Sequence, residues 1–165
     1  MKLKIIAAAA VLVLAVAGFF LATQKAAAPD VAFTTLQGQS FRTADLRGQV
    51  VLVNFWATTC GVCIEEMPAL KATQDKFQAR GYRTVAVAMD YDPPSRVGAF
   101  VGLNPLPFTF VLDRDGSIAR GFDDVRLTPT SFILNKRGEI VHKVLGEPDF
   151  DELHALIDKL LAEPT

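Results

Sequence analysis

Residues 51–68 read VLVNFWATTCGVCIEEMP, and this stretch decides the fold. A largely apolar run, Val50 to Phe55, leads through Trp56 and Ala57 into Cys60-Gly61-Val62-Cys63, which holds the only two cysteines of the chain. A near-continuous apolar run of this length is typical of a central strand that is buried on both faces. The stretch therefore predicts a buried strand followed by a helix, with both cysteines at the start of that helix.

The spacing of the two cysteines favours redox chemistry. Free backbone NH groups and the positive end of the dipole at a helix N-terminus stabilise a thiolate at Cys60 and lower its pKa. The short spacing lets the two sulfurs bond. Cys63, one turn further into the helix and more shielded, is the predicted resolving thiol, which attacks the mixed disulfide between Cys60 and a partner protein. We therefore predict that the pair is a catalytic, redox-active disulfide.

Two other uses of the pair have less support. A structural zinc site usually needs four ligands, yet no second cysteine pair exists, and His142 and His154 lie far downstream without ligand spacing. A purely structural disulfide between Cys60 and Cys63 would close a loop too short to add much stability. We expect no metal and no cofactor at this site.

The residues around the cysteines also indicate a family. Trp56-Ala57-x-x-Cys60-x-x-Cys63, followed by Glu65-Glu66-Met67-Pro68, resembles the thioredoxin-like superfamily and, within it, the membrane-anchored, extracytoplasmic thiol-disulfide oxidoreductases of the TlpA/ResA type, which have a redoxin domain. The resemblance covers nearly all of the chain after its N-terminal segment. It implies an α/β fold with a central mixed sheet flanked by helices, an N-terminal β-hairpin and a helical insertion.

The N-terminus reads as a membrane segment. Lys2 and Lys4 precede an uncharged run, Ile5 to Ala22, which is longer than the apolar region of most signal peptides. We favour an uncleaved anchor, while cleavage after Ala17 stays an alternative. Residues 1–28 would then form the cytoplasmic tip, anchor and linker, and residues 29–165 a single thioredoxin-like domain outside the cytoplasmic membrane, in the periplasm or on its extracytoplasmic face.

The remaining elements follow from periodicity and turn signals. The expected strands are a hairpin of 32–36 with 39–41, a strand at 84–89, a strand near 110–112, and a hairpin of 131–134 with 140–145. The expected helices are 60–79, kinked at Pro68 and ended by Gly81, a helix to about 101 capped by Ser95, and an amphipathic helix over 149–161. The acids Asp90 and Asp92 read as part of a solvated loop.

Pro129 is the second predicted functional element. The resemblance implies that this proline, just before an edge-forming strand, is cis and faces the cysteine pair. A sharp turn there would leave the backbone of Thr128 free to pair with an extended substrate. We also assign Trp56 to the substrate-binding residues, although packing beside the disulfide explains that residue more simply than chemistry.

Glu66 is the candidate proton acceptor. In thioredoxin a buried aspartate occupies the strand position that Asn54 holds here, and Asn54 cannot take a proton. In ResA-type members a glutamate lies in the active-site cleft at the place of Glu66, which follows Cys63 by three residues on one helix face. We hypothesise that Glu66 assists deprotonation of Cys63. The alternative is a solvated helix charge, as expected for Glu65.

The resulting hypothesis is a protein disulfide reductase. The resemblance implies protein thiol and disulfide substrates, such as apocytochrome c or metallochaperone thiols, and a membrane thiol reductant as electron donor. The net charge of −1 and the lack of a basic cluster argue against nucleic-acid binding. A DsbA-like oxidase and a non-enzymatic Cu(I)-binding module remain alternatives. A peroxiredoxin is disfavoured because Ala57 stands where its threonine would be.

Overall fold

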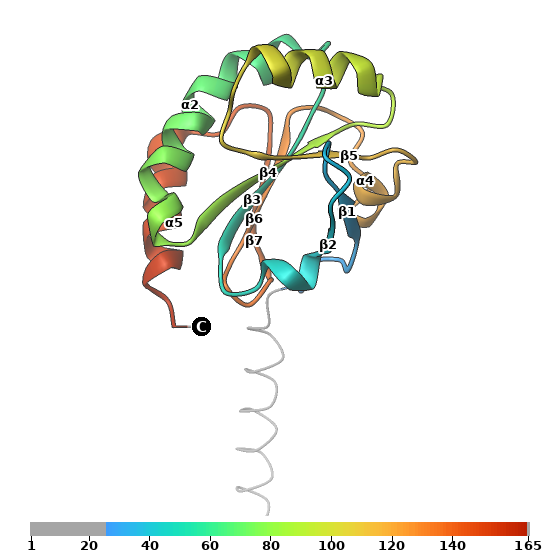
Figure 1. Cartoon of the computed structure of the whole chain (residues 1–165). Helices are drawn as coiled ribbons and strands as arrows, with labels where there is room; N and C mark the ends of the chain where they lie inside the picture. The colour runs from blue at the N-terminus through green and yellow to red at the C-terminus, as the bar shows by residue number, and fades with distance from the viewer. Residues whose placement is uncertain (1–25, 165) are drawn as a thin grey trace, which may run out of the picture.

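The structure, a computed structural model, describes residues 26–164, which form a two-stranded and a five-stranded sheet with helices packed on them (Figure 1). The strands are β1 (Ala32–Thr34), β2 (Ser40–Arg42), β3 (Val50–Trp56), β4 (Tyr82–Ala88), β5 (Thr109–Leu112), β6 (Thr130–Leu134) and β7 (Ile140–Leu145). The helices are α2 (Gly61–Phe77), α3 (Pro94–Leu103), α4 (Ser117–Gly121) and α5 (Phe150–Ala162), with short 3-10 helices η1 (Thr43–Leu46) and η2 (Gln78–Arg80).

Strand β3 is the centre of the main sheet. The strand order is β5-β4-β3-β6-β7; β3 runs parallel to β4 and antiparallel to β6. Every residue of β3 is buried, as expected for a strand covered on both faces. The predicted mixed sheet is therefore confirmed. The strand after Pro129 does not form the edge as expected, since β7 lies outside β6.

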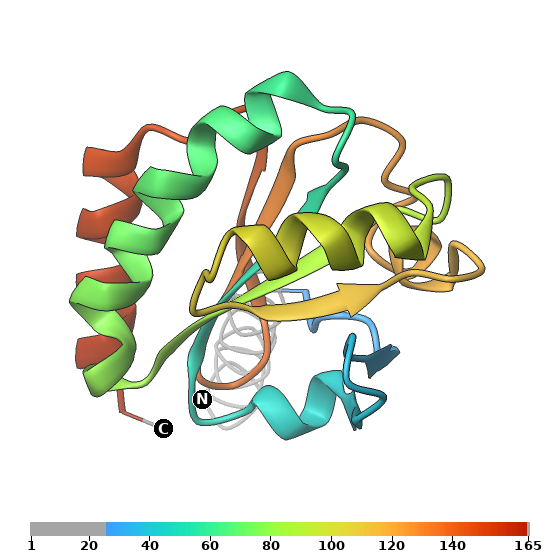
Figure 2. The same ribbon diagram turned by 45° about the horizontal axis from the view of Figure 1, so that its top comes forward.

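Successive side chains of β3 point to opposite faces of the sheet, and the two faces have different covers. Leu52 and Trp56 face α2, α3 and α5, which lie together on one side of the sheet (Figures 1 and 2). Val51, Val53 and Phe55 face the β1–β2 hairpin, η1 and α4 on the other side. The even positions of β3, which include Asn54, thus point toward the helix that carries the cysteines.

Most of the expected elements are present. The hairpin of β1 and β2, the α3 insertion between β4 and β5, the β6–β7 hairpin and α5 are confirmed. Pro68 lies inside α2, and Gly81 ends η2 with a φ of 96°, a left-handed conformation that suits glycine. Ser95 is not the cap of α3: the helix begins at Pro94, with Pro93 at the cap, because proline fits a first helical turn. The short helix α4 was not expected.

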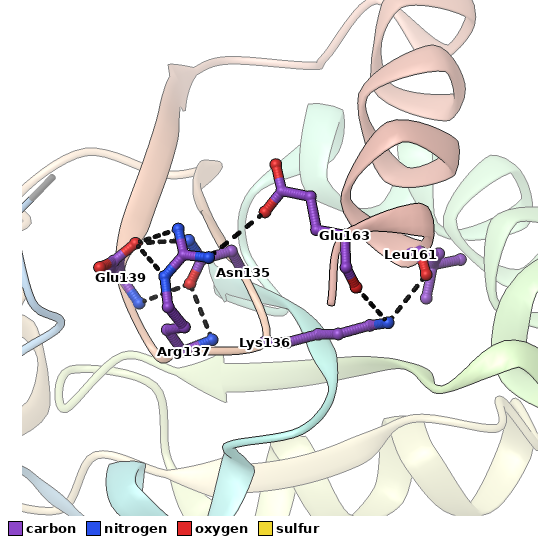
Figure 3. Close-up of polar contacts among 6 residues, drawn as sticks. All are labelled: Asn135, Lys136, Arg137, Glu139, Leu161 and Glu163. Carbon is purple, nitrogen blue, oxygen red and sulfur yellow. Dashed lines mark hydrogen bonds and ion pairs between the residues drawn. The ribbon is translucent and has the colours of Figure 1, made fainter. Parts of the chain in front are cut away.

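The turn between β6 and β7 is fastened to the end of α5 (Figure 3). Lys136 donates from Nζ to the backbone carbonyls of Leu161 and Glu163, at 2.8 and 2.9 Å. A cation is favourable at a helix C-terminus, where carbonyl groups lack partners. Arg137 pairs with the carboxylates of Glu139 and Glu163. These contacts hold α5 against the sheet at the end opposite to the cysteines.

Residues 26–28, which the sequence assigned to the linker, lie against β7. The backbone NH of Ala28 donates to the carbonyl of Gly138, and the NH of Ile140 donates to the carbonyl of Ala26. The expected anchor, residues 5–22, lies outside the described residues. Among residues 26–164, no helix is long and apolar enough to cross a membrane.

Candidate active site

The two cysteines form a disulfide at the N-terminus of α2. Cys60 is the N-cap residue, and its Sγ accepts a hydrogen bond from the backbone NH of Cys63 at 3.2 Å. The Cα atoms of the pair lie 5.2 Å apart. Cys63 is fully buried, whereas Cys60 is partly exposed, and Gly61 and Val62 are exposed in the first helical turn. Cys60 is therefore the sulfur that a partner can reach, and Cys63 is shielded, as predicted.

Three buried polar residues meet between β3, β6 and α2, on the helix-covered face of the sheet. The side-chain amide of Asn54 donates to Glu66 Oε1 at 2.9 Å and to Ser131 Oγ at 3.0 Å. All three residues are completely buried. Asn54 lies opposite Ser131 in the β3–β6 register, which explains their contact. Ser131 was not singled out in the sequence, because only the strand register brings it beside Asn54.

Glu66 is not a solvated helix charge. Burial raises the pKa of its carboxyl from an ordinary 4.5 to about 7; the hydrogen bond from Asn54 opposes this shift, and the negative charge of Glu147 adds to it. Within the described part of the chain, Glu66 Oε2 and Asn54 Oδ1 have no hydrogen-bond partner. Glu65, its neighbour, is exposed. A carboxyl that titrates near neutral pH can both take and give a proton under physiological conditions.

The bond between Thr128 and Pro129 is cis, as predicted. Thr130 lies opposite Phe55 in the β3–β6 register, so Pro129 comes to the end of the sheet from which the chain leads to Cys60. The carbonyl of Pro129 accepts from Gly146 NH at 2.8 Å. Thr128 is partly exposed, and among residues 26–164 neither its NH nor its carbonyl has a hydrogen-bond partner.

Comparison with known proteins agrees with this geometry. The family model described as Redoxin matches residues 23–157. The chain belongs to the redoxin family. It is 32% identical over 133 residues to the thiol-disulfide oxidoreductase ResA of a Bacillus cereus strain, covering 81% of this chain and 76% of ResA.

Solved structures share the fold. A protein from Chlorobium tepidum, described as a thiol:disulfide interchange protein DsbE, superposes with a TM-score of 0.77 at 30% identity, covering 84% of this chain and 98% of the other. A protein from Neisseria meningitidis, described as a thioredoxin, gives a TM-score of 0.76 at 35% identity, covering 83% and 91%. This redoxin is therefore a thiol-disulfide oxidoreductase with a thioredoxin-like fold, and its substrates are protein thiols and disulfides.

Trp56 packs inside this redoxin rather than at its surface. The side chain is fully buried in the same apolar cluster as Cys63 and Met67. Its ring lies 5.2 Å from that of Phe100 and 5.8 Å from that of Phe110, between centroids. In the oxidised structure, Trp56 is thus placed to report on the disulfide by fluorescence, but it offers no surface to a substrate.

The expectation of a solvated loop is wrong for Asp92. Its side chain is only 3% exposed, and its carboxylate accepts hydrogen bonds from Thr58, in the segment that leads to Cys60. Asp90 is exposed, as expected. The sequence alone could not predict this contact, because it forms only when the folded loop brings residues 34 positions apart together.

The histidines lie away from the disulfide. His142 is exposed on β7, and His154 on α5 contacts the hydroxyl of Thr73 at 2.9 Å. Burial, with the charge of Lys76 next, lowers the pKa of His154. In the part of the chain that the structure describes, no three His, Cys, Asp or Glu side chains form a group that could hold a metal ion.

Proposed function

We propose that this redoxin reduces protein disulfides on the extracytoplasmic side of the cytoplasmic membrane, with Glu66 as the proton acceptor for Cys63. The Cys60 thiolate attacks one sulfur of the partner disulfide, which forms a mixed disulfide and releases one partner thiol. Cys63 then gives up its proton and attacks the Cys60 sulfur. The Cys60–Cys63 bond forms, the second partner thiol leaves, and two electrons have passed to the partner.

The observation that carries the proposal is the burial of Glu66 on the same helix as Cys63. Side chains three positions apart on a helix are neighbours, with about 5–6 Å between their Cβ atoms. Cys63 is fully buried, so its proton needs an acceptor inside the protein. Asn54 cannot take a proton, whereas Glu66, with a pKa of about 7, can.

The surface around Cys60 suits an extended partner. Val62 is 45% exposed beside the sulfur, and Leu127 is 62% exposed just before Thr128. The free backbone NH and carbonyl of Thr128 can pair with an extended segment of the partner by strand addition. The exposed side chains of Val62 and Leu127 can then contact the side chains of that segment. In this proposal Thr128 and Pro129 form the substrate-binding element, and Trp56 packs in the apolar cluster behind the disulfide.

Location and electron donor are proposed from the sequence. Lys2 and Lys4 followed by the apolar run Ile5–Ala22 support an anchor whose tip stays in the cytoplasm. The domain would then act outside, where a membrane thiol reductant returns two electrons to the Cys60–Cys63 disulfide. Apocytochrome c and metallochaperones are the proposed partner classes, because both present cysteine thiols that must be reduced before they bind haem or metal.

The reduction potential of Cys60/Cys63 tests the direction of transfer. The full chain in detergent is equilibrated with glutathione or dithiothreitol buffers, and Trp56 fluorescence reports the reduced fraction. A potential at or below about −220 mV supports a reductase, whereas one near about −120 mV would make the protein an oxidant of the DsbA kind.

The role of Glu66 is tested by the pH profile of exchange with a peptide disulfide. Glu66→Gln is expected to slow resolution by Cys63 and to remove an inflection near pH 7. Glu65→Gln removes the same formal charge at an exposed position of the same helix and should leave the profile unchanged. Identical profiles for wild type and Glu66→Gln would overturn this role.

A further inference from the structure

The loop after β4 runs directly beside the segment that carries Cys60. The NH of Met89 donates to the carbonyl of Trp56 at 3.0 Å, which continues the β3–β4 pairing past the end of both strands. The NH of Asp92 then donates to the carbonyl of Met89 at 3.0 Å and closes a turn. This turn directs the side chain of Asp92 toward the residues between Trp56 and Cys60.

Asp92 binds Thr58 with both carboxylate oxygens. Oδ2 accepts from the backbone NH of Thr58 at 2.6 Å, and Oδ1 accepts from its hydroxyl at 2.7 Å. A buried carboxylate is costly unless it accepts such bonds, and charge-assisted bonds are the stronger kind. Thr58 lies in the turn from Ala57 to Cys60, which the Cys60 NH closes by donating to the Ala57 carbonyl at 3.0 Å.

We propose that Asp92 is a positioning residue that stabilises the Cys60–Cys63 disulfide relative to the dithiol. The carboxylate and the disulfide both order the short segment that contains Thr58 and Cys60. When one constraint has already ordered a segment, the second costs less conformational entropy, so the two reinforce each other. Asp92 therefore raises the effective concentration of one sulfur at the other and makes the dithiol a stronger reductant.

This role goes beyond the proposed function. It rests on reversible thiol–disulfide exchange by Cys60 and Cys63, and it holds whichever direction electrons take in the cell. A purely structural role for Asp92 would stabilise the oxidised and reduced proteins equally. The reduction potential separates the two roles, because only a difference between the two states changes it.

The experiment measures the equilibrium of the full chain in detergent with glutathione near neutral pH. Two glutathione thiols reduce the Cys60–Cys63 bond and yield two cysteine thiols and one glutathione disulfide. Thr58→Val removes the hydroxyl and leaves the charge of Asp92 in place, and Asp92→Ala removes both bonds. Thr58→Ser keeps the hydroxyl, and Thr59→Val makes the same change at the next, exposed side chain. Ultraviolet thiolate absorbance gives the Cys60 pKa of each variant, which separates thiolate stabilisation from loop ordering.

Thr58→Val is expected to raise the equilibrium constant for reduction about tenfold, a shift of about 30 mV to less negative potential for a two-electron couple. Asp92→Ala should shift it at least as far, and adding Thr58→Val to Asp92→Ala should change it little further, because the hydroxyl then has no carboxylate to bind. Thr58→Ser and Thr59→Val should keep the wild-type value.

Two results would overturn the inference. One is a wild-type potential in Thr58→Val, and the other is full additivity of Thr58→Val and Asp92→Ala. If Asp92→Ala does not fold, Thr58→Val against Thr58→Ser decides the question alone. If the wild-type pair exchanges with neither glutathione nor dithiothreitol, the proposed function fails first, and this outcome is visible before any variant is made.

Discussion

Glu66→Gln should change how the stability of the oxidised protein depends on pH. Glu66 is fully buried, and burial raises its pKa from 4.5 to about 7. In the unfolded chain this carboxyl loses its proton near its ordinary pKa, whereas the folded protein keeps it until about pH 7. Between these values the folded state binds more protons, so stability falls as pH rises. Glutamine cannot titrate, and the variant should lack this loss.

The structure gives the size of the effect. Over each pH unit in which only the folded state holds the proton, the free energy of unfolding falls by about 1.4 kcal/mol. The interval from 4.5 to about 7 thus corresponds to a loss of about 3 kcal/mol in wild type. The loss is complete above about pH 8 and absent below about pH 4. Replacing the carboxyl by an amide also changes the free energy of unfolding by an amount that is the same at every pH. This amount does not affect the slope.

Urea unfolding of the disulfide form measures the prediction. Cys60 and Cys63 do not titrate while bonded, so they add nothing to the pH dependence. The difference in unfolding free energy between wild type and Glu66→Gln should change by about 3 kcal/mol from about pH 4.5 to about pH 8. Glu65→Gln is the matched control and should follow wild type. Parallel curves for wild type and Glu66→Gln would refute the raised pKa and the argument built on it.

Three further predictions concern the cysteines and the fold. Cys63→Ser should accumulate a mixed disulfide with a peptide disulfide at Cys60, seen by mass spectrometry, whereas Cys60→Ser should form none; equal trapping in the two variants would contradict the assigned roles. Asp149→Ala removes the side chain that accepts from two backbone NH groups at the start of α5 and should cost about 1 kcal/mol in urea unfolding. Phe122→Ala opens a cavity among three phenylalanine rings and should cost about 3–5 kcal/mol by the same measurement, while a loss below about 1 kcal/mol would contradict its burial.

Local sequence signals predicted the elements that local physics determines. The apolar run before Trp56 indicated the buried strand, because a strand buried on both faces needs apolar side chains at nearly every position. Gly81 ended the helical region because the left-handed conformation there suits glycine. The cis bond at Pro129 and the helical insertion came from the family resemblance and not from these signals.

Contacts between distant segments were the part that sequence could not predict. From the sequence, Asp92 was predicted to be a solvated acid in a loop. Only the folded structure shows that its carboxylate accepts two hydrogen bonds from Thr58. Ser131 joins the group around Asn54 because of the β3–β6 register, which a single sequence does not contain. Helix α4 is five residues long, too short for a periodic pattern to reveal it.

The buried acid of this redoxin, Glu66, lies on the helix that carries Cys63 and not on the central strand. Asn54, on β3, reaches α2 through its side-chain amide, but an amide cannot take a proton. Glu66 instead shares α2 with Cys63, so helix geometry sets their separation, while the amide of Asn54 holds one carboxylate oxygen at 2.9 Å. The helix therefore fixes Glu66 relative to Cys63 independently of the turn that carries Cys60, which lies at the N-cap. The turn that leads to Cys60 is held separately, by the two hydrogen bonds that Thr58 donates to Asp92.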